Sequence, residues 1–126
     1  MSYSAVVLDE KSRFKLIDWA HEKFPKIKAE GWEIKCHHMT IKMGELPSYL
    51  EHDLNSAQTL EVSGYGSDDK VIAVRVSGYF AVNDVPNITI AVNKSNGGKP
   101  TMSNKLTKWQ ALINSFNLKG TVEMVQ

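Results

Sequence analysis

The chain has 126 residues, of which 42% are hydrophobic and 23% charged, so its size and composition fit one folded domain and exclude a disordered or collagen-like chain. Fifteen Lys and Arg nearly balance fourteen Asp and Glu, and the net charge of +1 argues against a large nonspecific nucleic-acid binder while leaving room for one local phosphate site. The single cysteine excludes an internal disulfide, and the absence of a signal peptide and of a long apolar stretch predicts a cytoplasmic protein without a membrane span.

The first quarter of the chain predicts a strand followed by a helix. The apolar run at residues 5–8 is typical of a short buried strand. An apolar stripe at three- and four-residue steps then predicts an amphipathic helix. Asp9 or Ser12 can cap its start, and Pro25 ends it because the proline ring clashes with the preceding turn. The residues of the stripe are Phe14, Ile17, Ala20 and Phe24.

Residues 32–43 predict one continuous strand, whose alternation divides the polar side chains between two faces. One face carries His38, Thr40 and Lys42. The other face carries His37, so regular strand geometry predicts that His37 takes no part in a site built around His38. Residues 44–55 then form a connector with a short helical turn.

The second half of the chain predicts several short strands and a second helix. The strands are expected at residues 59–62, 71–76, 87–92 and 121–125. Gly64, Gly66 and Asp68-Asp69 mark a turn after the first of them. Ser103 or Asn104 caps the predicted second helix. Its apolar stripe consists of Leu106, Trp109, Ile113 and Phe116.

Helices mixed with directly consecutive strands indicate the α+β class. We expect one domain over residues 1–126, in which a mainly antiparallel sheet forms a central groove and two helices pack outside it. The sequence leaves the oligomeric state open.

Two of the predicted strands carry the same local pattern. His38-Met39-Thr40-Ile41 aligns with Asn87-Ile88-Thr89-Ile90, so each strand has a polar residue and a threonine two positions apart. Residues two apart lie on the same face of a strand. If the strands lie side by side, one groove is lined by His38, Thr40, Asn87 and Thr89.

This pair of motifs resembles the 2H phosphoesterase superfamily, whose signature is two His-x-Thr/Ser motifs on facing strands. The first motif is intact, and Asn87 stands where the family has its second histidine. Residues 86–109 also resemble the compact branch of Swiss Army Knife RNA-repair-like domains. The resemblance implies a phosphodiesterase that needs no metal or cofactor and cleaves RNA 2′,3′-cyclic phosphate ends or small cyclic oligonucleotides. It is compatible with roles in RNA repair, anti-phage defence or immune evasion.

Phosphodiester cleavage explains why the family uses two histidines. Near neutral pH, one neutral imidazole accepts a proton from the attacking group and one protonated imidazole donates a proton to the departing oxygen. Thr40 and Thr89 would hold the nonbridging phosphate oxygens. Asn87 does not titrate, so it can only bind. Three explanations of Asn87 stay open: an engineered His-to-Asn change that leaves an inactive variant, a natural binder that has lost turnover, or an accidental resemblance.

Further positions are candidates for substrate binding. Gly97, Gly98 and Lys99 either cradle a phosphate through backbone N–H groups or form a plain strand-to-helix turn. Lys42 either attracts phosphate or ends the strand in solvent. As partner we expect a nucleotide or oligonucleotide, with no metal, membrane or DNA duplex. The alternative function is a noncatalytic module that binds and sequesters nucleotides.

Overall fold

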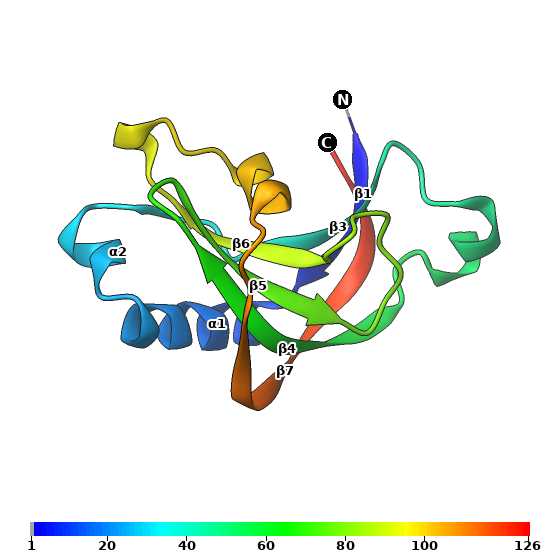
Figure 1. Cartoon of the computed structure of the whole chain (residues 1–126). Helices are drawn as coiled ribbons and strands as arrows, with labels where there is room; N and C mark the ends of the chain where they lie inside the picture. The colour runs from blue at the N-terminus through cyan, green and yellow to red at the C-terminus, as the bar shows by residue number, and fades with distance from the viewer. Residues whose placement is uncertain (1) are drawn as a thin grey trace.

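A computed structural model describes residues 2–126, and Figure 1 shows the arrangement of their strands and helices. The strands are β1 (Tyr3–Leu8), β2 (Glu33–Ile34), β3 (His38–Met43), β4 (Ala57–Ser67), β5 (Val71–Ser77), β6 (Asn87–Val92) and β7 (Gln110–Val125). The α-helices and short 3₁₀ helices (η) are α1 (Glu10–Lys23), α2 (Lys26–Ala29), η1 (Ser48–Asp53), η2 (Lys94–Asn96) and η3 (Pro100–Lys105). None of the helices in this described part of the chain has the length and apolarity needed to cross a lipid bilayer.

The strands form one antiparallel sheet that closes on itself. Their order is β2-β6-β3-β1-β7-β4-β5, and β5 pairs back with β6, so β6, β3, β1, β7, β4 and β5 form a ring. β1 and β7 run side by side from Tyr3 opposite Val125 to Leu8 opposite Gly120, so the first and last strands lie together (Figure 1). The prediction of an α+β fold with a mainly antiparallel sheet is confirmed.

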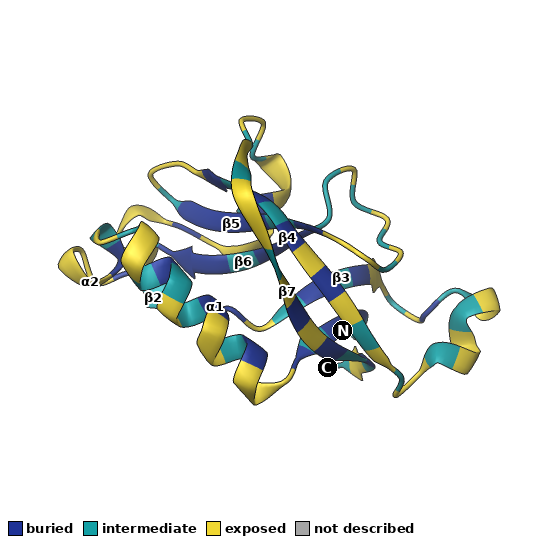
Figure 2. Ribbon diagram, turned by 90° about the horizontal axis from the view of Figure 1, so that it is seen from below, coloured by how far each residue is buried: buried dark blue, intermediate teal, exposed yellow. Residues whose placement is uncertain are grey.

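The apolar core fills the inside of this ring. Alternation along β3 and β6 turns Met39, Ile41, Ile88 and Ile90 inward, where each is fully buried. Figure 2 shows β5 and β6 almost entirely buried. The outward side chains of β3 and β6 are therefore the ones that can reach a site between these two strands.

Helix α1 packs against the sheet through a line of residues four apart. Ser12, Leu16 and Ala20 are its buried residues, and the Asp9 carboxylate caps its start by accepting a hydrogen bond from the Ser12 backbone N–H at 2.7 Å. The predicted stripe is partly wrong, because Phe14 is 52% exposed. The face that meets the sheet is centred on Leu16, which lies between the predicted stripe positions.

Residues 110–125 form strand β7, so the predicted second helix is wrong. β7 pairs with β1 over residues 120–125 and with β4 over residues 110–111 and 116–121, and these ladders hold the segment in an extended conformation. Ile113, which the sequence placed in a buried helical stripe, is 99% exposed. Ser103 and Asn104 lie inside η3 and do not cap an α-helix.

The predicted turn is wrong at Gly64 and Gly66, which lie inside β4, and right at Asp68-Asp69, which lie between β4 and β5. A Cβ atom at Gly64 would lie 2.8 Å from the Gln110 backbone oxygen, so glycine permits the close approach of β4 to β7. The turn to β5 comes later, where the Asp68 carboxylate accepts hydrogen bonds from two backbone N–H groups.

The predicted strand over residues 32–43 is interrupted at residues 35–37. Before the interruption β2 pairs with β6, and after it β3 pairs with β1 and shares one pair with β6, Met39 opposite Ile88. Cys36 lies at the change of partner with a φ of +47°, a value uncommon outside glycine. β3 and β6 diverge on either side of this pair, and the line between these two strands is called the seam.

Candidate functional site

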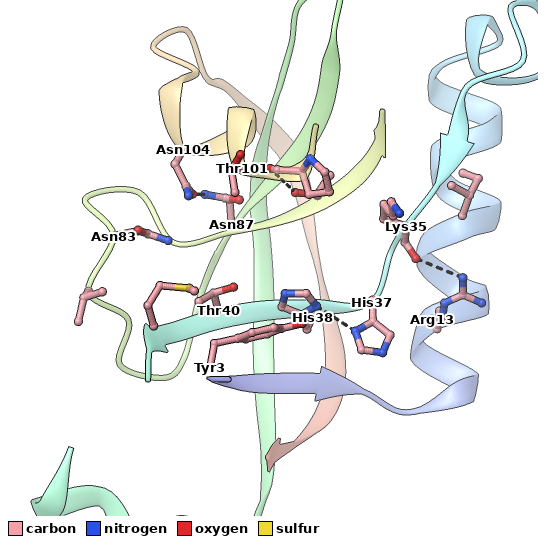
Figure 3. Close-up of a pocket in the computed structure, with 15 residues that line it drawn as sticks. Tyr3, Arg13, Lys35, His37, His38, Thr40, Asn83, Asn87, Thr101 and Asn104 are labelled. Carbon is pink, nitrogen blue, oxygen red and sulfur yellow. Dashed lines mark hydrogen bonds between the residues drawn. The ribbon is translucent and has the colours of Figure 1, made fainter. Parts of the chain in front are cut away.

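A cavity of about 650 Å³ lies over the seam and is termed the seam cavity (Figure 3). Outward side chains of β3 and β6 form its two sides, with His38 and Thr40 on one and Asn87 and Thr89 on the other. Residues of η3 extend the side formed by β6. The four motif residues, which come from distant parts of the sequence, therefore meet at one cavity.

His38 is half-buried in the side of the seam cavity formed by β3. The Tyr3 ring packs beside it, with ring centroids 5.1 Å apart. Burial, together with the nearby His37, lowers the pKa of His38 from 6.5 to about 4. His38 is therefore a neutral imidazole at neutral pH, the form that accepts a proton.

His37 lines the same cavity, so the prediction that it points away from His38 is wrong. The two Nδ1 atoms lie 2.9 Å apart, and the rings meet nearly edge-on at an interplanar angle of 82° (Figure 3). The cause is the positive φ of Cys36, which interrupts strand alternation just before β3 begins. No periodic pattern in the sequence signals such a backbone conformation.

Asn87 is 7% exposed, and two acceptors hold its side-chain amide in place. Its Nδ2 atom donates to the Val85 backbone oxygen at 2.8 Å and to Asn104 Oδ1 at 3.0 Å. Both amide hydrogens are thus engaged, so Oδ1 is the Asn87 atom that can accept a hydrogen bond from a ligand. An amide oxygen accepts a hydrogen bond from a hydroxyl or a base N–H, so Asn87 is not placed to donate to an anionic phosphate oxygen.

Thr89 holds η3 on the sheet, and its hydroxyl hydrogen is not free for a ligand. That hydroxyl donates to the Pro100 backbone oxygen at 3.1 Å, so Ser103 Oγ, 2.7 Å away, is the donor of the second bond. By contrast, the hydroxyls of Thr40 and Thr101 line the cavity and have no hydrogen-bond partner within residues 2–126. The sequence motif includes Thr40 but not Thr101, which lies in η3 and belongs to no motif.

The two ends of the seam cavity differ in chemistry. Arg13 from α1 and Lys35 line one end, where Arg13 donates to the Lys35 backbone oxygen at 3.2 Å and the Lys35 ammonium pairs with Glu33. Met43 and Val82 line the other end and are 59% and 53% exposed. An anionic group fits the first end and an apolar or aromatic group fits the second. These residues come from separate elements, so the sequence alone could not group them.

The other predicted binding residues lie elsewhere. Among the described residues, the cavity lining includes neither Lys42 nor any of Gly97, Gly98 and Lys99. Gly97 ends η2 with a φ of +76°, and a Cβ atom at Gly98 would lie 2.2 Å from the Lys70 backbone oxygen. Close packing of this loop on the turn between β4 and β5 thus explains the two glycines without a phosphate.

Within residues 2–126, no group of three or more His, Cys, Asp or Glu side chains is placed to hold a metal ion. Neither a protein-family model nor a curated protein sequence matches the chain.

The site's own geometry offers one neutral imidazole, two free hydroxyls, a cationic end and an apolar end. The side formed by β6 and η3 contributes no titratable side chain among the described lining residues. These groups can bind a phosphate ester and accept one proton from an attacking water or hydroxyl.

Proposed function

We propose that the protein is a metal-independent phosphodiesterase of the 2H type, which binds a nucleotide or small oligonucleotide in the seam cavity and turns it over slowly. The observation that supports this best is the half-buried, neutral imidazole of His38 in a cavity that also has free hydroxyls and a cationic end. The low turnover follows from Asn87, which cannot exchange a proton with the substrate.

In the proposed reaction, His38 accepts the proton of the attacking water or hydroxyl as that oxygen bonds to phosphorus. The hydroxyls of Thr40 and Thr101 donate to nonbridging phosphate oxygens, and the Arg13 charge offsets the negative charge of the phosphate. The bond from phosphorus to the departing oxygen breaks, and that oxygen takes a proton from solvent because Asn87 has none to give. Loss of one proton-transfer group slows such reactions by about 10²–10⁴-fold.

The two ends of the cavity suggest how the ligand is oriented. Its phosphate lies toward Arg13, whose charge is offset by no carboxylate among the described residues, whereas Lys35 pairs with Glu33. Its base lies toward Met43 and Val82, which supply apolar surface for a flat ring. The Asn83 amide lines the same end and can pair with donors and acceptors on the base edge.

A second candidate function is a noncatalytic module that sequesters nucleotides, and the hydrogen bonds of Asn87 favour it. The Val85 backbone oxygen and Asn104 match its two amide hydrogens. A neutral imidazole has a single N–H, so a histidine at this position would leave one acceptor unpaired. A chain adapted to asparagine at this position would bind its ligand without cleaving it.

The two functions separate in one experiment on three proteins: the chain itself, Asn87→His and Asn83→His. Asn83 lines the same cavity at its apolar end, so its variant adds an imidazole in the wrong place. Turnover of a 2′,3′-cyclic nucleotide and of cyclic dinucleotides is measured beside calorimetric binding. Turnover by Asn87→His at least 100-fold above both others supports the phosphodiesterase. Saturable binding without turnover in all three supports sequestration, and absence of binding in all three rules out both functions.

A further inference from the structure

His37 and His38 share a hydrogen bond at the seam cavity, although only His38 belongs to the motif. Their Nδ1 atoms are 2.9 Å apart, whereas a regular strand would send the two side chains to opposite faces. The arrangement depends on Cys36, whose left-handed backbone conformation is unfavourable for a residue other than glycine. Backbone strain of this kind is concentrated at functional sites, so the placement of His37 requires a functional explanation.

The direction of this hydrogen bond decides the chemistry of His38. A neutral imidazole carries its hydrogen on one of its two nitrogens. If His38 donates from Nδ1, its Nε2 atom keeps a lone pair and can accept a proton. If His37 donates, His38 accepts at Nδ1 and carries its own hydrogen on Nε2, where it cannot act as a base.

Solvent exposure favours donation by His38. His37 is exposed, so its Nε2–H can donate to water while its Nδ1 atom accepts. His38 is half-buried, and no group in residues 2–126 accepts a hydrogen bond from its Nε2 atom. A poorly solvated N–H donor without a partner is unfavourable, so the tautomer with a lone pair on His38 Nε2 is preferred.

We propose that His37 is a positioning residue that accepts the Nδ1–H of His38 and thereby directs the lone pair of His38 Nε2 into the seam cavity. The tautomer is a property of the free protein, and its use in proton transfer rests on the proposed function. The other titratable groups lining the cavity are Tyr3 from β1, Arg13 from α1 and Lys35 ahead of β3.

The test reads the tautomer directly, through ¹⁵N NMR correlations that distinguish a protonated from an unprotonated ring nitrogen. In the full chain at neutral pH, we expect His38 to be protonated at Nδ1. His37→Asn keeps an acceptor and should keep this tautomer, whereas His37→Phe removes the acceptor and should make the Nε2–H form dominant. His21→Phe on α1, outside the cavity lining, is the matched control and should change nothing.

Protonation of His38 at Nε2 in the parent chain, or an unchanged tautomer in His37→Phe, would overturn the proposal. The spectra also show whether each variant is folded. Catalysis is then tested in the Asn87→His background, where adding His37→Phe should lower kcat about 10-fold or more with little change in KM. Adding His37→Asn should restore most of the rate. Absence of turnover in the Asn87→His background counts against the proposed function alone, because the tautomer is measured without substrate.

Discussion

The ring of Tyr3 on β1 lies against the imidazole of His38 on β3, with centroids 5.1 Å apart and planes inclined by 37°. β1 and β3 are paired neighbours, with Tyr3 opposite Met43 and Val7 opposite His38, so the Tyr3 side chain extends along β3 to reach the imidazole. Tyr3 therefore shields one face of His38 from water, and burial raises the pKa of the Tyr3 phenol itself. The contact connects the packing of the sheet to the protonation state of the candidate base.

Replacing Tyr3 should change the pKa of His38. Tyr3→Ala exposes the imidazole to water, so its pKa should rise from about 4 toward 6.5. Tyr3→Phe keeps the ring and should leave the pKa of His38 near that of the parent. NMR titration of the imidazole ring measures both variants. Equal pKa values in the parent and in Tyr3→Ala would mean that Tyr3 does not shield His38.

The lowered pKa of His38 predicts a loss of stability in acid. The folded-state pKa is about 4 and the unfolded value is 6.5, so between these pH values the unfolded chain binds more protons. The free energy of unfolding should therefore fall as the pH drops from 6.5 toward 4, with a contribution from His38 of at most about 3 kcal/mol. Urea unfolding at several pH values gives this slope.

His38→Gln is the variant that tests the acid effect. It removes the titrating group, so its stability should depend less steeply on pH than that of the parent. Identical slopes for His38→Gln and the parent would contradict the depressed pKa.

The two motif threonines should have separable roles. Thr89→Val removes the hydroxyl that bonds to Pro100 and Ser103, and it should lower the free energy of unfolding by about 1–3 kcal/mol. Thr40→Val removes an unpaired hydroxyl, so stability should hardly change. A hydrogen bond to a charged phosphate is worth about 1.5–3 kcal/mol, so Thr40→Val should weaken cyclic-dinucleotide binding by about 10–100-fold. Denaturant unfolding and calorimetry compare the variants, and a destabilised Thr40→Val with unchanged affinity would reverse the assignment.

The loop glycines should matter for stability and not for ligand binding. Gly98→Ala places a Cβ atom against the Lys70 backbone oxygen and should destabilise the fold by about 1–3 kcal/mol. Lys99→Gln, at the exposed start of η3, should change neither stability nor nucleotide affinity. A large loss of affinity in Lys99→Gln with normal stability would mean that this loop belongs to the binding site.

Local sequence patterns predicted the elements whose boundaries depend on near neighbours in the chain. Strand β6 has its predicted limits, since its alternating apolar residues end at clear turn signals. The helical pattern assigned to Leu106, Trp109, Ile113 and Phe116 failed because pairing with β1 and β4 decides the structure of residues 110–125. Such long-range pairing leaves no mark in a short window of sequence.

In the candidate site, too, local patterns predicted some residues, and long-range structure determined the others. His38 and Thr40 could be singled out because strand alternation places residues two apart on one face. His37 could not, because its position depends on one unusual φ value at Cys36. Tyr3 and Arg13 come from β1 and α1, and only the closed sheet brings them to the cavity.

The seam has a consequence for the protein's motions. β3 and β6 share the single pair of Met39 with Ile88, so the amides along this line should exchange with solvent faster than those between β1 and β7. A ligand that contacts both His38 and Asn87 would join β3 to β6 beside their one backbone pair. Ligand binding and the opening of this line would then be linked, so a bound nucleotide should slow the exchange of these amides.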